Sequence, residues 1–152
     1  MVETAAQNGQ FIVVGVDGSA PSLEALRWAA RQAHLTGAIL RALTSWELAT
    51  GTGWTPVFPV DYDPEAIAKQ VLDEAILDTL GAAPEVPLER VVKEGHAAPV
   101  LLEAAKGADL LVVGNRGHGA FAGMLIGSVS DHVVRHAPCT VVVVHFEKPA
   151  DH

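Results

Sequence analysis

The residues best suited to chemistry lie in a glycine-rich segment that runs from Gly114 to Ser130. It carries five glycines, follows an apolar run and precedes a helical pattern that begins at Ser128. Glycine lets a ligand approach the backbone closely, and successive backbone N–H groups in such a loop and at a helix start bind anions. Ser128, Ser130 and Arg116 add donors for phosphate oxygens. The segment therefore predicts a phosphate site, with a plain flexible connection as the alternative interpretation.

The segment departs from two common phosphate-binding motifs. Gly114-x4-Gly119 has the first spacing of a Walker A loop, but residues 120–121 are Ala-Phe where that loop has its lysine and hydroxyl residue. The dinucleotide fingerprint is also missing, because the first apolar run ends in Gly-Val-Asp-Gly over residues 15–18. Since the lysine that engages a transferring phosphate is absent, the loop favours binding over rapid phosphoryl transfer.

Asp17 follows the first apolar run and has two open interpretations. Its carboxylate could bind a ribose or a base, or hold a metal ion through water. It could equally form a turn beside Gly18 and Ser19, because aspartate side chains often hydrogen-bond the backbone two residues on. The sequence does not favour one interpretation over the other.

Other candidate groups favour structural roles. His132 and His136 lie four residues apart on a predicted helix, but no third ligand accompanies them, so we expect no metal site. Cys139 begins an apolar run and is interpreted as a small core residue. Four aromatic residues can cover a base or anchor a loop, and we favour anchoring: Trp46, Trp54, Phe58 and Tyr62.

Five apolar, valine-rich runs alternate with four helical patterns along the chain. They predict strands over residues 11–16, 38–46, 88–93, 109–113 and 140–145, and helices over 20–36, 64–80, 99–106 and 128–136. This alternation predicts an α/β fold with a doubly wound parallel sheet and helices on both faces. Such sheets bind ligands beyond the carboxyl ends of their strands. Residues 47–63 form an unusually long connection, which we interpret as a lid or a partner surface.

Charge and composition exclude several classes of protein. The 152 residues carry 10 basic and 18 acidic side chains, a formal net charge of −8, which gives no support for nonspecific binding to nucleic acid or to an anionic membrane. One cysteine excludes an intrachain disulfide, and the first residues lack the pattern of a signal peptide. We expect a cytoplasmic protein with a flexible segment over 1–10, one domain over 11–146 and a loose tail over 147–152.

Three stretches resemble the universal stress protein family. They are Gly114-x2-Gly117-x9-Gly127-Ser128, the opening IVVGVDGS of residues 12–19 and the closing PCTVVVVH of residues 138–145. The glycine-serine spacing resembles that of the nucleotide-binding members. The resemblance implies a five-stranded sheet of order 3-2-1-4-5. It also implies an ATP-binding stress-response or signalling module, with Mg²⁺ or Mn²⁺ accompanying the ATP. A cyclic AMP site, a nucleotide-free interaction scaffold and a slow ATPase are the alternatives within this fold.

The same resemblance assigns the site residues. The end of the first strand would lie near adenine and ribose, the end of the second strand would contact adenine through its backbone, and the glycine-rich segment would hold ribose and phosphates. In that order, the residues are Gly15, Val16 and Asp17; Ser45; and Gly114, Asn115, Arg116, Gly117, His118, Gly119, Gly127, Ser128, Val129 and Ser130.

This sequence lacks the motifs of three enzyme classes. An adenylating pyrophosphatase of related fold needs Ser-Gly-Gly-x-Asp-Ser after the first strand, and a receiver domain needs an aspartate where Lys93 and Glu94 stand. A serine hydrolase needs a Gly-x-Ser-x-Gly turn. We therefore expect a binding protein rather than an enzyme, with at most weak ATP hydrolysis.

The last predicted strand, Thr140 to Val144, contains four valines and would lie at the sheet edge. An uncovered edge promotes aggregation, because its N–H and C=O groups are unpaired. The same strand of a second copy could cover it around a two-fold axis, and the family resemblance implies the same assembly. We therefore expect a homodimer through this strand.

Overall fold

The computed structural model describes residues 10–48, 61–117 and 124–146. Within these residues the strands are β1 (Phe11–Gly15), β2 (Ile39–Trp46), β3 (Leu88–Glu94), β4 (Leu110–Gly114) and β5 (Thr140–Val144). The helices between them are α2 (Ala20–Thr36), α3 (Pro64–Leu80), α4 (Ala97–Ala104) and α5 (Ser128–His136). The predicted alternation is confirmed, and each strand begins and ends within one residue of its predicted bounds.

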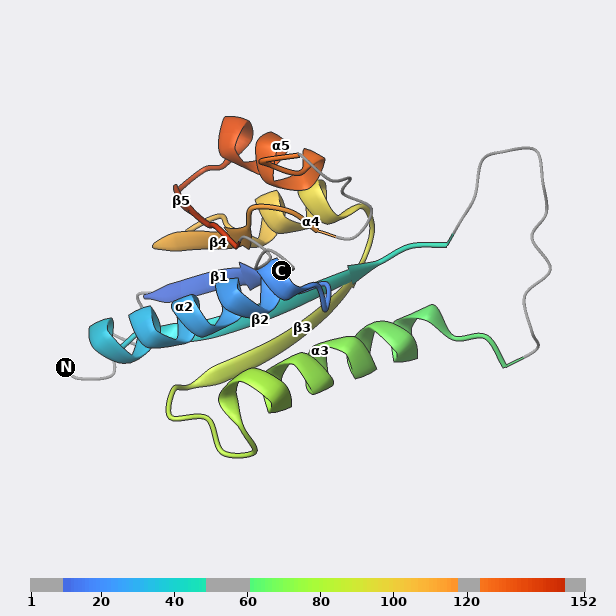
Figure 1. Cartoon of the computed structure of the whole chain (residues 1–152), viewed down its shortest axis with the longest axis horizontal. Coiled ribbons are helices and arrows are strands. Elements are labelled where there is room, and N and C mark those ends of the chain that lie inside the picture. Colours follow the sequence, from blue (N-terminus) through green and yellow to red (C-terminus); the bar gives the residue numbers. More distant parts are fainter. Residues whose placement is uncertain (1–9, 49–60, 118–123, 147–152) are drawn as a thin grey trace, which may run out of the picture.

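All five strands form one parallel sheet in the order β3-β2-β1-β4-β5, as expected. β1 lies at the centre, where Ile12 pairs with Leu40 of β2 on one side and with Leu110 of β4 on the other. The chain therefore winds outward in one direction from β1 to β3 and in the other from β4 to β5 (Figure 1). This reversal places the carboxyl ends of β1 and β4 side by side, which is where doubly wound sheets bind their ligands.

Helices cover both faces of the sheet, because the strand side chains alternate between two apolar clusters. Ile12 and Val14 of β1 point to one cluster and Val13 to the other. The first cluster includes Leu26 of α2 and Leu72 of α3, and the second includes Leu101 of α4 and Val133 of α5. The doubly wound α/β architecture is thus confirmed, with α2 and α3 on one face and α4 and α5 on the other (Figure 1).

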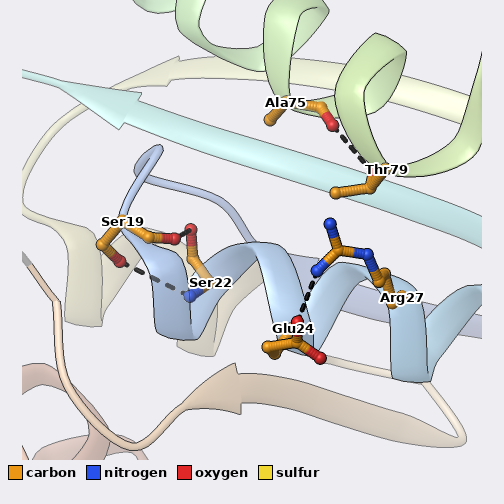
Figure 2. Close-up of polar contacts among 6 residues, drawn as sticks. All are labelled: Ser19, Ser22, Glu24, Arg27, Ala75 and Thr79. Atoms are coloured by element: carbon orange, nitrogen blue, oxygen red, sulfur yellow. Dashed lines mark hydrogen bonds and ion pairs between the residues drawn. The ribbon is translucent and has the colours of Figure 1, made fainter. Parts of the chain in front are cut away.

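The start of α2 is fixed by a pair of serines (Figure 2). The hydroxyl of Ser19 accepts a hydrogen bond from the backbone N–H of Ser22, and the hydroxyl of Ser22 donates to the carbonyl of Ser19. The helix ends at Gly37, whose φ of 78° lies in the left-handed region that glycine adopts without strain. These contacts hold the first turn of α2 directly beyond the carboxyl end of β1.

The third predicted helix begins earlier along the chain than expected. It was expected over 99–106, but α4 occupies Ala97–Ala104. Pro99 is therefore its third residue rather than its first. A proline fits there because the N–H groups of the first turn have no partner within the helix.

Cys139 packs against the second cluster, directly before β5. Burial raises the pKa of its thiol, and the charge of Asp109 raises it further. A raised pKa keeps a thiol protonated and unreactive, which agrees with its interpretation as a small core residue. Among the described residues, no helix is both long enough and apolar enough to cross a bilayer.

Burial differences along α3 give a direct test of this packing. Leu72 is fully buried, whereas Leu77 on the same helix has 58% of its surface exposed. Leu72→Ala should lower the free energy of unfolding by about 2–5 kcal/mol, because it leaves a cavity in the core. The matched Leu77→Ala variant should change it by about 0.5 kcal/mol or less. Equal effects in urea unfolding would contradict the observed position of α3.

Candidate functional site

A cavity of about 540 Å³ opens at the carboxyl ends of β1, β2 and β4, a size typical of small-molecule sites. It is bounded by the first turns of α3 and α5. Most of the predicted site residues line it: Gly15, Val16, Asp17, Ser45, Gly114, Arg116, Gly117, Gly127, Ser128, Val129 and Ser130. Residues from four separate stretches of the sequence thus meet at the point where the sheet reverses its winding.

The first turn of α5 presents backbone donors to this cavity. Gly127 is its N-cap and offers no side chain, so the N–H groups of residues 128–130 have no side-chain cap within the part of the chain that is described. The Gly127 N–H itself donates to the carbonyl of Asn115 at 2.6 Å, which holds the helix start against the loop after β4. Free N–H groups and the positive end of the helix dipole make this turn suited to an anion.

Asp17 takes the turn role, which was one of its two interpretations. Its Oδ1 accepts hydrogen bonds from the backbone N–H of Ser19 at 2.9 Å and from the Ser19 hydroxyl at 2.5 Å, so it does form a turn. Its Oδ2 lies against Gly117, where an added Cβ would come within 2.6 Å of it. Asp17 therefore caps the turn with one oxygen and approaches the glycine-rich loop with the other.

Gly114 is required by close packing against α2. A Cβ at this position would lie 2.6 Å from the backbone carbonyl carbon of Pro21, closer than real side chains come. Gly127 has more room, since the nearest atom to an added Cβ would be the Arg116 Cα at 3.4 Å. Gly117 and Gly127 both have backbone conformations outside the positive-φ region, so the demand on Gly117 is for clearance alone.

Two predicted ligands have their polar side chains committed elsewhere. The Ser130 hydroxyl is buried and donates to the carbonyl of Gly114 at 2.5 Å, so it ties α5 to β4. The Asn115 side chain is also buried, and Asn115 is not among the residues that line the cavity. Its amide instead bonds to residues 125, 145 and 146. The anion donors left at the helix start are therefore the backbone N–H groups and the exposed Ser128.

Arg116 lies at the cavity with part of its guanidinium unsatisfied. Its Nη2 donates to the carbonyl of Phe146 at 3.2 Å, while its buried Nε has no hydrogen-bond partner among the described residues. A buried donor without a partner is costly, and a bound anion or hydroxyl would satisfy it. His118 and Gly119, the remaining predicted ligands, lie outside the described residues, as do Trp54 and Phe58.

The apolar walls of the cavity were not predicted as a group. Leu43 of β2, Leu101 of α4, Ile67 and Val71 of α3 and Met124 before α5 line it together. Trp46 and Tyr62 also line it, although sequence reasoning favoured an anchoring role for them. These walls suit a flat apolar group next to a polar anion site, as aromatic and aliphatic linings do in other ligand pockets.

The two helix histidines lie apart from this cavity. The rings of His132 and His136 pack with centroids 4.5 Å apart on exposed positions of α5. Within residues 10–48, 61–117 and 124–146, no group of three histidine, cysteine, aspartate or glutamate side chains is arranged to hold a metal ion.

Comparison with known proteins assigns the family. The family model for universal stress proteins matches residues 10–145. The chain belongs to the universal stress protein family. A universal stress protein of Mycolicibacterium smegmatis is 35% identical over 159 residues, covering all of this chain and 53% of the relative. One from Mycobacterium tuberculosis is 35% identical over 133 residues, covering 87% of this chain and 44% of the relative. The chain thus spans about half the length of these relatives.

A solved structure supports the same assignment. The crystal structure of a universal stress protein in complex with cAMP matches with a TM-score of 0.66 and 35% identity, covering 90% of this chain and 97% of the other. The structure of an Archaeoglobus fulgidus family member in complex with dAMP matches with a TM-score of 0.61 and 24% identity, over 89% of this chain and 97% of the other. The second likeness shows the shared fold.

The approach of Asp17 to Gly117 can be tested by a double-mutant cycle. Gly117→Ala should lower the free energy of unfolding by about 1–2 kcal/mol, because the new Cβ overpacks against the Asp17 carboxylate. Asp17→Ala should cost clearly less in the Gly117→Ala background than alone, giving a coupling of at least about 0.5 kcal/mol. Strictly additive effects in denaturant unfolding would show that the two residues do not meet.

Proposed function

We propose that this protein binds ATP, with Mg²⁺ or Mn²⁺ carried by the phosphates, and that nucleotide occupancy controls its interactions in a stress response. The observation that carries the proposal is the uncapped first turn of α5, which faces the loop after β4 at the point where the sheet reverses. Backbone N–H groups of residues 128–130 would hold phosphate oxygens, and the unsatisfied Nε of Arg116 would donate to the ligand.

The apolar half of the cavity supports an adenine nucleoside over free phosphate. Ile67 and Val71 of α3 form an apolar wall of the cavity that would suit a base, and Ser45 at the end of β2 lines the same cavity. Asp17 lies between this wall and the helix start, where a ribose hydroxyl could donate to Oδ2. The family member at 35% identity that was crystallised with cAMP supports the same class of ligand.

Cyclic AMP is the second candidate because of that neighbour. The two ligands differ in charge and length, and three phosphates would use more of the N–H groups at the start of α5 than one cyclic phosphate can. Direct titration of both nucleotides with the same protein sample therefore separates the candidates. We expect ATP to bind more tightly than cyclic AMP.

Nucleotide binding should depend on the helix start. Gly127→Glu adds bulk and a negative charge at the N-cap of α5, so ATP affinity measured by calorimetry should fall at least tenfold, about 1.4 kcal/mol or more. Val134→Glu is the matched control, because it adds the same charge to an exposed position of α5 outside the cavity. Unchanged affinity in Gly127→Glu, or an equal loss in both variants, would contradict the proposed phosphate position.

Catalysis should be weak. No lysine lines the described cavity, and one oxygen of Asp17 is already bonded to Ser19, so few groups are available to stabilise a transferring phosphate. With highly purified protein, multiple-turnover ATP hydrolysis should lie far below the typical enzyme rate of about ten per second. Turnover near that rate, abolished by substitution of a cavity residue, would show that the protein is an enzyme.

We further propose that β5 pairs two copies of the chain. β5 is the last strand of the sheet order and pairs with β4 alone among the described strands, and its four valines are only half-buried. Sedimentation equilibrium at micromolar concentration should give twice the chain mass, and Val142→Pro should dissociate or precipitate the protein, because proline disrupts strand pairing. A monomeric unmodified protein would refute this assembly.

A further inference from the structure

The buried side chain of Asn115 joins three separate segments of the chain. Its Nδ2 donates to the carbonyl of Leu125, just before α5, at 3.1 Å and lies 3.2 Å from Nδ1 of His145. Its Oδ1 accepts a hydrogen bond from the backbone N–H of Phe146, just after β5, at 3.0 Å. One amide group thus connects the end of β4, the approach to α5 and the residues that follow β5.

The partners fix the orientation of this amide. Leu125 offers a carbonyl, which only accepts, and Phe146 offers a backbone N–H, which only donates. The oxygen of Asn115 must therefore face Phe146 and the nitrogen must face Leu125. Since the nitrogen also faces Nδ1 of His145, this ring nitrogen must accept, which selects the imidazole tautomer with its proton on Nε2.

The backbone reinforces the same connection. The N–H of Asn115 donates to the carbonyl of Val144 at 2.9 Å, and its carbonyl accepts from the N–H of Gly127 at 2.6 Å. The neighbouring Arg116 side chain reaches the carbonyl of Phe146. A shift of the loop after β4 must therefore disturb the segment 144–146, and the reverse holds as well.

We propose that Asn115 is a positioning residue that couples nucleotide binding to the end of β5. This inference rests on the proposed nucleotide site: the ligand would order residues 116–117 and 127–130, and Asn115 would transmit that order to His145 and Phe146. Because β5 is the outer strand of the described sheet, occupancy of the cavity then changes the edge available to a partner. Both N–H bonds of the Asn115 amide are already used, so its role is to hold the loop rather than to contact the nucleotide.

Nitrogen NMR of the His145 ring and amide exchange at Phe146 test this coupling directly. Without ligand, the unmodified protein should show the Nε2–H tautomer at His145, and ATP should slow exchange of the Phe146 amide several-fold. In Asn115→Ala, the tautomer preference should be lost, Phe146 should no longer respond to ATP, and ATP affinity should fall about tenfold. Asn115→Asp should keep Phe146 partly protected, because a carboxylate still accepts, but should reverse the tautomer preference, because its second oxygen accepts from a proton on Nδ1 of His145.

Ser128→Ala is the matched control, because this exposed residue lies at the proposed phosphate site and not in the Asn115 network. It should weaken ATP binding while leaving the His145 tautomer unchanged. If circular dichroism shows that Asn115→Ala does not fold, His145→Ala replaces it in the test. That variant should lower ATP affinity about threefold and reduce the response of Phe146 to ATP. Two results would overturn the coupling. One is ATP binding that is unaffected in the folded Asn115 and His145 variants. The other is a protein that binds ATP without any change in the His145 nitrogen signals or in amide exchange at Phe146.

Failure of the proposed function gives a different result. If the unmodified protein binds no adenine nucleotide, calorimetry shows this directly. The proposed response of Phe146 to ATP is then wrong as well. The ligand-free comparison of His145 in the unmodified protein and Asn115→Ala still decides whether Asn115 links the loop to β5. Equal tautomer populations in those two proteins would overturn the structural link itself.

Discussion

The contact between Gly114 and the first turn of α2 is the constraint on which the site depends. β4 can end beside the carbonyl of Pro21 only because residue 114 has no side chain. This close approach places the loop after β4 next to the turn held by Asp17 and Ser19. The start of α5 is then held against β4 by the hydroxyl of Ser130, which donates to the Gly114 carbonyl. Without this packing, the donors at the helix start and the end of β1 would not share one cavity.

A chain with a net charge of −8 can still offer an anion site, because the relevant field is local. The positive end of a helix acts within about its first turn, and backbone N–H groups carry no compensating side chain. At this site the described lining includes Arg116 as well as two carboxylates, Asp17 and Glu47. Net charge therefore argues against broad binding to polyanions without arguing against a single phosphorylated ligand.

Sequence patterns predicted most of the fold because the central strands β1, β2 and β4 are largely buried apolar runs and the helices have clear ends. Ser19, Gly37 and Asp63 mark helix ends by chemistry that acts locally. The strand order came from the family resemblance, since alternation alone is compatible with several orders. The start of α4 was misplaced because Pro99 is acceptable throughout a first turn.

The sequence predicted the glycine-rich part of the cavity lining but not its apolar walls. Ile67 and Val71 of α3 lie far from Leu101 of α4 in the sequence, and only the folded sheet, which carries these two helices on opposite faces, brings them to one cavity. The same limit applies to Asn115 and Ser130, whose residue types suit a ligand. The side-chain partners of Asn115 lie just before α5 and just after β5, and the partner of Ser130 lies in β4. Residue type predicted a capacity to hydrogen-bond, and tertiary structure decided with which group.

The central claim is that phosphate groups bind at the first turn of α5 beside the loop after β4. Mapping backbone amide resonances during an ATP titration tests it most directly. We predict saturable shifts at residues 114–117 and 127–130, with the exposed end of α2 around Leu35 unaffected. An ATP titration that leaves residues 127–130 unchanged while shifting another surface would contradict this account.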